Sequence, residues 1–212
     1  MRVLPLHNLV ALIFTFFISL PAANAKNISV SILGGEDLSH FTITIKRGNY
    51  SLINQNTVYT LFKGNQVVIQ RGGVAIIGDT IQFKITNFKM LGNDYVNHFE
   101  ISNGKIQVRY DDHLKVELYN GKISLINEVD LDRYVAGVVE GEAGYNLPLE
   151  YYKLQAILCR TYALKNINRH ASEGYDLCDK VHCQVYHQKC QKNDIIKATA
   201  STSGLVVVDH DL

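Results

Sequence analysis

Two glutamates stand among glycines in the stretch VVEGEAGYNLP, residues 138–148. Glu140 and Glu142 come just before a predicted long helix, and glycine leaves room for another group to approach the backbone closely. A carboxylate held in such a place has the chemistry of a general acid and base. The stretch is therefore the first candidate for a reactive site.

A second cluster lies downstream in CDKVHCQVYHQKC, residues 178–190. Its potential ligands are Cys178, His182, Cys183, His187 and Cys190. Thiolate and imidazole are ligands that zinc favours, and four of them close a structural site. The alternative is a disulfide between Cys178 and Cys183, which is natural in an exported chain.

The segment between the two clusters predicts a helix from Pro148 to about His170. Proline suits the first position of a helix, and Glu150 in the first turn suits the helix dipole. Apolar residues recur at helical spacing and predict the buried face, namely Leu149, Ala156, Cys159, Ala163 and Ile167.

Polar residues form a stripe on this otherwise apolar helix. Lys153 and Arg160 are seven residues apart, as are Gln155 and Tyr162, so each pair projects from nearly the same side. The stripe is either a solvated face, which is usual for Lys and Arg, or one wall of an anionic or sugar-lined groove with Glu142 at its mouth.

The first 25 residues have the order of a secretory signal peptide. Arg2 and His7 precede the apolar run LVALIFTFFISL, and the tripeptide ANA ends at Ala25. The run is shorter than the roughly 20 residues that span a bilayer as a helix. The alternatives are an uncleaved anchor or a buried helix. Export of the remaining chain to the periplasm or cell envelope is expected.

The composition predicts a folded chain with a substantial core, since 47% of the 212 residues are hydrophobic and 19% are charged. The predicted signal peptide holds one basic residue and no acid, which leaves 20 basic and 20 acidic residues in the remainder. This balance argues against broad nucleic-acid binding, which needs a basic face.

Residues 28–130 predict β structure, because branched and aromatic residues alternate or cluster between closely spaced Gly, Asn and Asp. The Asn-Gly pairs at 103–104 and 120–121 are good hairpin signals. This part is expected to be a scaffold. With the helices that follow, it predicts an α+β fold.

Two shorter elements are expected in the second half. LDRYVAGVV, residues 131–139, predicts a short helix capped by Asp130 or Asp132. Near the end of the sequence, a break at Gly204 is expected to lead into a strand over residues 205–208.

Two long segments resemble the stage II sporulation protein D family, which is related to amidase-enhancer proteins of bacterial cell walls. They are LINEVDLDRYVAGVVEGEAGYNLPLEYYKLQAILCRTYAL and GYDLCDKVHCQVY. The family pattern joins Tyr-x-x-Gly-Val-Val and Ser-Glu-Met-Pro to a helix ending in Arg-Thr-Tyr-Ala and to Cys-Asp-x-x-His-Cys-Gln-Val-Tyr. The combination is specific, although each piece alone would be weak.

The residue patterns and the resemblance together predict three parts of the chain: a signal peptide over 1–25, a β-rich region over 26–104, and, from the resemblance, a sporulation-protein-D-like domain over 105–212. The family continues with a returning strand and a glycine-rich segment that have no counterpart here. The domain is therefore expected to be incomplete at its C-terminus.

The family pattern also implies site residues. Its acid falls on Glu142, and two helix residues implicated in activity fall on Lys153 and Arg160. Gln155 and Tyr162 match the motif as well. Ser, Met and Pro of the family pattern are replaced by Gly141, Ala143 and Gly144, which predicts a looser loop beside the acid.

Family members implicated in catalysis are lytic transglycosylases of peptidoglycan, which prefer glycan strands stripped of stem peptides. Such an enzyme uses one carboxylate and no cofactor, whereas ordinary glycoside hydrolysis uses two carboxylates. The acid must hold its proton near neutral pH, which apolar walls favour, and Val138, Val139 and Ala143 are expected to supply them. Lys153 and Arg160 are expected to contact the substrate rather than Glu142.

Some family members bind zinc around the downstream segment, and the best-matching ligands here are His170, Cys178, His182 and Cys183. His187 or Cys190 could replace one of them. The resemblance thus implies a lytic transglycosylase that acts on peptidoglycan strands, with a cell-wall amidase as a potential partner. The alternatives are a non-catalytic glycan-binding or amidase-enhancing factor and an inactive fragment.

Overall fold

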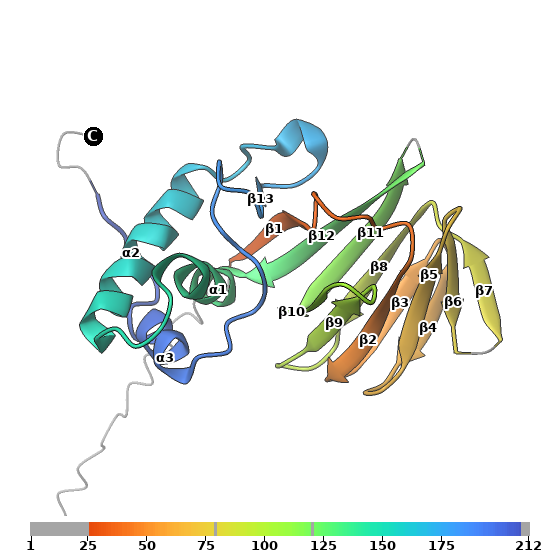
Figure 1. The fold of residues 1–212 in the computed structure, drawn as a ribbon, viewed down its shortest axis with the longest axis horizontal. Coiled ribbons are helices and arrows are strands. Elements are labelled where there is room, and N and C mark those ends of the chain that lie inside the picture. The colour runs from red at the N-terminus through yellow and green to blue at the C-terminus, as the bar shows by residue number, and fades with distance from the viewer. Residues whose placement is uncertain (1–25, 79, 120, 209–212) are drawn as a thin grey trace, which may run out of the picture.

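The computed structural model describes residues 26–78, 80–119 and 121–208 (Figure 1). The predicted signal peptide, residues 1–25, lies outside the described part. Within these described ranges the fold is α+β, as the sequence predicted: two β-sheets occupy the first two thirds of the chain, and three α-helices follow. No helix in the described ranges combines the length and apolar character needed to cross a bilayer.

The larger sheet has seven strands in the described residues. In spatial order they are β13 (Leu177–Cys178), β1 (Asn27–Ile32), β12 (Lys122–Asp130), β11 (His113–Tyr119), β8 (Asn87–Gly92), β3 (Tyr50–Asn54) and β4 (Thr57–Leu61). Over the same part of the chain, the smaller sheet has six strands, in the order β10 (Gln107–Asp111), β9 (His98–Ser102), β2 (Phe41–Arg47), β5 (Gln66–Gln70), β6 (Val74–Ile77) and β7 (Ile81–Lys84).

The two sheets pack against each other through one hydrophobic core. Alternation along β2 buries Phe41, Ile43 and Ile45 on one face, as expected for a strand with one face in the core. Across the layers, the Tyr50 and Phe99 rings meet edge to face at 6.3 Å between centroids.

The helices gather at one end of this sandwich (Figure 1). They are α1 (Leu131–Ala143), α2 (Leu149–Lys165) and α3 (Asn193–Ser201), with a short 3₁₀ turn over Ala171–Glu173. Asp130 caps α1, since its carboxylate accepts hydrogen bonds from the backbone N–H groups of Asp132 and Arg133.

Two sequence predictions need correction. First, the acids do not lie in a loop: α1 continues through Glu142 to Ala143, and its C-cap is Gly144, whose φ of 72° suits glycine. Second, residues 205–208 form no strand. Instead, the Val207 backbone N–H donates to Thr161 Oγ1 on α2 at 2.9 Å.

Strand β1 lies between two strands that come much later in the sequence. It pairs antiparallel with β12 and parallel with β13. Asp176, just before β13, accepts hydrogen bonds from the Ser29 N–H at 2.9 Å and from the Ser29 hydroxyl at 2.7 Å. The segment that carries the Cys/His cluster is thereby held against β1.

Candidate functional site

Glu140 and Glu142 both bind the segment between β13 and α3. We call residues 183–192 the strap. Glu142 Oε1 accepts from the Val185 N–H at 3.4 Å, and Glu140 Oε2 accepts from the Gln191 N–H at 2.6 Å. The last turn of α1 therefore holds the strap at two points.

The glycines of α1 allow this close contact. A Cβ atom on Gly137 would lie 2.6 Å from the Gln188 carbonyl oxygen, and one on Gly141 would lie 2.8 Å from the Val185 carbonyl oxygen. Since the two glycines are four residues apart, they lie on one face of the helix. The backbone of the strap packs directly on that face, so a side chain at either position would collide with it.

Side chains of the strap anchor it in the core. Tyr186 is fully buried, and its hydroxyl donates to Asn127 Oδ1 at 3.0 Å. Gln184 accepts from the Tyr134 hydroxyl at 3.2 Å and donates to the Cys159 carbonyl at 3.3 Å. Burial raises the pKa of Tyr186 well above its usual range, so its hydroxyl stays protonated as a donor.

The Glu142 carboxylate also meets α2. Its Oε2 accepts from Cys159 Sγ at 3.7 Å. Burial and the nearby Glu142 charge raise the pKa of the Cys159 thiol to about 12, so the sulfur keeps the proton that it donates. The sequence reading placed Cys159 only in the core and missed this contact, because spacing along α2 does not reveal what α1 brings to its surface.

Glu142 itself is exposed. The expected apolar enclosure of its carboxylate is therefore not found in the described chain. Val138 and Val139 are instead fully buried in the core.

Gln155 and Tyr162 share a face of α2 with Cys159, because the three residues follow the i, i+4, i+7 spacing. Gln155 Nε2 donates to the Tyr151 hydroxyl at 3.2 Å, and the Tyr162 hydroxyl donates to the His182 carbonyl at 3.1 Å. This stripe thus runs past Glu142 toward the Cys/His cluster. Two of the predicted substrate-binding residues therefore lie beside the predicted acid.

Lys153 and Arg160 lie on another face of α2. Lys153 pairs with the exposed Glu150 at 2.7 Å. Arg160 is only 1% exposed, and its Nε and Nη2 bind Asp132 Oδ1 at 2.9 and 2.7 Å. Because its donors are taken up inside the protein, Arg160 does not face a groove.

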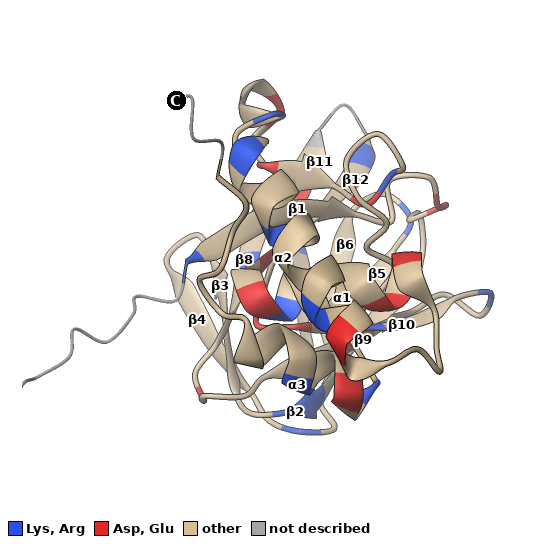
Figure 2. Cartoon of the chain, turned by 90° about the vertical axis from the view of Figure 1, so that its left-hand side faces the viewer, with Lys and Arg blue, Asp and Glu red and all other residues tan. Residues whose placement is uncertain are grey.

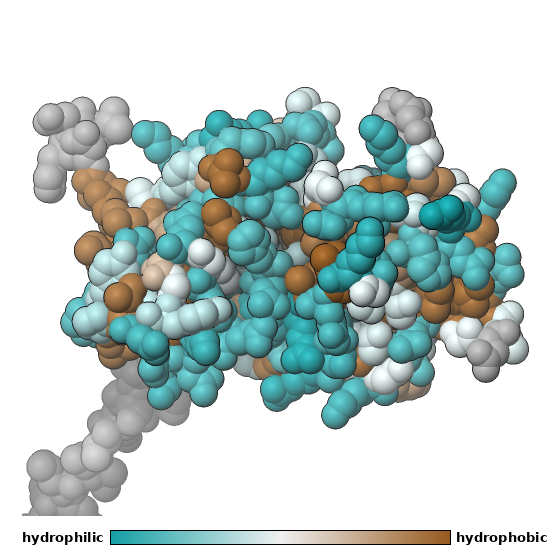
Figure 3. All heavy atoms as spheres, in the orientation of Figure 1, coloured by the Kyte–Doolittle hydropathy of each residue, from teal (hydrophilic) through white to brown (hydrophobic). Residues whose placement is uncertain are grey.

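Carbonyl groups complete the Arg160 environment. Nη2 donates to Thr199 O on α3 at 3.2 Å, and Nη1 donates to Leu205 O at 3.1 Å. The guanidinium thus joins α1, α2, α3 and the tail at residues 205–208. Figure 3 shows this apolar tail beside the grey terminal residues.

The Cys/His cluster brings together the four ligands expected from the sequence. The donor atoms of His170, Cys178, His182 and Cys183 all lie within 4.8 Å of one another. Cys183 Sγ is 3.4 Å from His170 Nε2, and Cys178 Sγ is 3.5 Å from His182 Nε2. Ligand atoms around tetrahedral zinc lie about 3.3–3.8 Å apart at ordinary bond lengths, so the donor set fits this ion.

A carboxylate orients one of these ligands. His170 Nδ1 lies 2.6 Å from Glu173 Oε1, which leaves Nε2 facing Cys183. Histidines that bind metals usually have such a partner on the other ring nitrogen. All four cysteines of the chain are free thiols in the structure, so the Cys178–Cys183 disulfide is not formed there.

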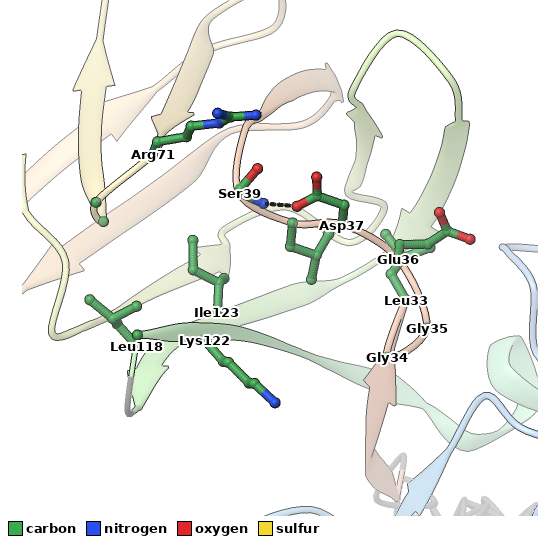
Figure 4. Close-up of a pocket in the computed structure, with 14 residues that line it drawn as sticks. Leu33, Gly34, Gly35, Glu36, Asp37, Ser39, Arg71, Leu118, Lys122 and Ile123 are labelled. Atoms are coloured by element: carbon green, nitrogen blue, oxygen red, sulfur yellow. Dashed lines mark hydrogen bonds between the residues drawn. The ribbon is translucent and has the colours of Figure 1, made fainter.

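One hollow adjoins the cluster, and a second hollow adjoins the first. The first, of about 440 Å³, is lined by His170, Cys178 and His182 among others. It shares Gly34, Leu38 and Ile123 with a hollow of about 660 Å³, in which Arg71 and Lys122 lie on opposite sides (Figure 4). Glu142 lines neither. Figure 2 shows basic and acidic residues intermixed over the helical end of the molecule.

Comparison with known proteins finds one matching family model and one curated relative above the level of chance. Residues 119–208 match the family model described as Stage II sporulation protein. An uncharacterized protein of Brachyspira hyodysenteriae is 34% identical over 76 residues, which is 35% of this chain and 21% of that relative. The chain thus spans about a fifth of the length of the curated relative that it matches. No solved structure matches the chain. Over residues 119–208, the chain is thus similar to the stage II sporulation protein D family.

Proposed function

We propose that the chain is an exported lytic transglycosylase that cleaves peptidoglycan glycan strands, preferably strands without stem peptides. The observation that carries this proposal is the position of Glu142. It is an exposed carboxylate, held by Cys159 and the Val185 N–H, beside a polar stripe of α2. The match of residues 119–208 to the Stage II sporulation protein family model supports the same reaction.

In the proposed reaction, Glu142 first protonates the glycosidic oxygen as the bond to the anomeric carbon breaks. It then takes the proton from the 6-hydroxyl of the same N-acetylmuramic acid, and that oxygen attacks the anomeric carbon. The product is a 1,6-anhydro sugar, and neither water nor a second carboxylate takes part. Gln155 and Tyr162 are positioned to bind sugar hydroxyl or acetamido groups, while Lys153 remains a predicted contact for a more distant part of the strand.

The proposal is tested by incubating the purified protein with denuded glycan strands and analysing the products by mass spectrometry. Anhydro-muramyl products support it, whereas sugars with reducing ends would indicate hydrolysis. Binding without any product favours the second candidate, a glycan-binding or amidase-enhancing factor. That candidate is favoured by the exposure of Glu142 and by its two donors, since such a carboxylate also suits simple binding of sugars.

We propose that His170, Cys178, His182 and Cys183 hold a structural zinc ion. The strap begins at Cys183, two residues before the N–H that binds Glu142. A closed metal site would fix this end of the strap and thereby the Glu142 carboxylate. The metal has no part in the proposed bond cleavage.

Glu173→Gln is expected to lower zinc affinity about 10- to 100-fold, because it weakens the partner that orients His170.

Cys178→Ser should reduce both bound metal and the melting temperature, since metal binding contributes to folding. Elemental analysis, chelator competition and thermal melts measure these effects. Cys190→Ser, outside the cluster, is the control and should keep the metal. A metal-free protein with Cys178 and Cys183 linked in a peptide map would contradict the site.

We also propose export with removal of residues 1–25. Edman sequencing of the exported form should begin at Lys26. A membrane-bound form that still begins at Met1 would indicate an anchor instead. In the envelope, a cell-wall amidase that removes stem peptides would supply the preferred strands, and no nucleic-acid partner is proposed.

A further inference from the structure

A basic hollow of about 540 Å³ lies where the strap crosses the edge of the smaller sheet. Five of its eight lining residues are Lys or Arg, and none is acidic: Lys46, Arg47, Gly48, Lys63, His98, Arg109, Lys189 and Gln191. Its volume lies in the range of ordinary ligand pockets. The chain as a whole is nearly neutral, so this local excess of positive charge needs a reason.

A β-bulge places two consecutive basic residues at this hollow. The pairing of β2 with β9 shifts between Ile45 and Arg47: Ile45 pairs with Phe99 and Arg47 with His98, so Lys46 is the extra residue between them. In a regular strand, neighbouring side chains point to opposite faces, whereas a bulge re-aims one of them. Lys46 and Arg47 thus both line the hollow.

The turn after β4 adds a third cation. The Gly64 N–H donates to the Ile45 carbonyl at 2.8 Å, and the Ile45 N–H donates to the Asn65 carbonyl at 3.0 Å. These bonds hold the exposed Lys63 beside the bulge. On the other side, the Lys189 N–H donates to the Arg109 carbonyl at 2.7 Å, which fixes the strap to β10.

Two nearly buried acids form ion pairs with side chains of the hollow but do not balance its positive charge. Glu100 binds Lys46 at 3.3 Å and Arg109 at 2.8 Å, and its side chain is only 7% exposed. Asp111 lies 2.8 Å from His98 Nδ1 and 3.9 Å from Lys189 Nζ. Five cations against these two acids leave an excess of three positive charges.

The hollow is connected to the candidate catalytic helix through the strap. Gln191 lines the hollow, and its N–H donates to Glu140, two residues before Glu142 on α1. A polymer that lies across Glu142 therefore has a basic surface nearby, on the Glu140 side of the helix.

We propose that this hollow binds carboxylate groups of the glycan strand itself, at sugars beyond the cleavage point. The inference rests on the proposed function. Each N-acetylmuramic acid exposes a free lactyl carboxylate once its stem peptide is removed, whereas an intact stem occupies that group in an amide bond. The basic hollow would thus make stripped strands the better ligands, because Arg and Lys bind carboxylates by charge-assisted hydrogen bonds.

The test uses Arg47→Ala/Lys63→Ala in a Glu142→Gln background, so that strands stay intact during titration calorimetry. Neither Arg47 nor Lys63 forms an ion pair with another described residue, so their loss should spare the fold. Affinity for denuded strands at low salt is expected to fall about tenfold, as for two exposed charge contacts. Wild-type affinity for strands with amidated carboxyl groups should fall by a similar factor.

Lys84→Ala/Lys105→Ala is the matched control, because it removes two exposed charges elsewhere, and it should leave affinity unchanged. Equal binding by Arg47→Ala/Lys63→Ala and the control would overturn the proposal, as would indifference to amidation. Polyphosphate that binds the hollow without displacing glycan would assign it to a phosphate polymer instead. If the unsubstituted protein releases no anhydro sugar, the proposed reaction fails, while this binding comparison still decides the role of the hollow.

Discussion

Glu142→Gln is expected to lower the release of anhydro-muramyl products from denuded strands by roughly 100- to 10,000-fold, the usual contribution of general acid–base catalysis. The amide keeps the shape of the side chain but cannot transfer the proton. Glycan binding should persist, because the α2 stripe and the strap remain. Product release is measured by mass spectrometry, and binding by calorimetry.

Glu140→Gln is the control from the same helix turn. The Glu140 carboxylate binds the Gln191 N–H, a bond that the amide oxygen can still accept, so the rate should change little. Full activity in Glu142→Gln would remove Glu142 from the mechanism. A large loss in Glu140→Gln with full activity in Glu142→Gln would exchange the two roles.

Arg160→Met should lower the free energy of unfolding by about 3 kcal/mol, the lower end of the range for breaking a buried ion pair. The lower end applies because the Asp132 side chain is 28% exposed and would regain water. The carbonyls of Thr199 and Leu205 would also lose a donor. Urea unfolding followed by circular dichroism measures the change.

Asp132→Ala and the double variant complete a cycle that isolates the pair. Lys153→Met, on the same helix but in an exposed pair with Glu150, should change stability by less than about 0.5 kcal/mol. If Arg160→Met unfolds like the wild type but binds glycan more weakly, Arg160 is a substrate contact and its structural role is refuted.

The sequence predicted the α+β class and the start of α2 because these depend on local patterns. Proline at 148 and a regular apolar spacing are sufficient to place a helix. The end of α1 was missed, because Gly141 resembles a loop residue until the strap is seen packed on it and on Gly137. Glycine lowers the stability of a helix, and here the packing of the strap, which is distant in the sequence, offsets that loss.

The candidate site was predicted only in part for a related reason. Seven-residue spacing correctly indicates that Lys153 and Arg160 point the same way, but it cannot show that α3 covers only one of them. The Cys/His ligands were easier to predict from the sequence, since three of them lie within six residues. His170 could be chosen only through the resemblance, because Asp176 and β1 bring its turn back to the cluster.

The pairing of β1 with both β12 and β13 has a consequence for how the chain folds. Ser29 and Asp176 are 147 positions apart, so this bond closes a very large loop. Loop closure of this kind costs chain entropy before it brings any contact energy, which makes such folds slow to form. Early folding of the helical end alone would leave β12 and β13 without the strand between them. We therefore expect insertion of β1 between β12 and β13 to be the last kinetic step of folding. The β-sandwich and the helical end should then become resistant to proteases at the same time.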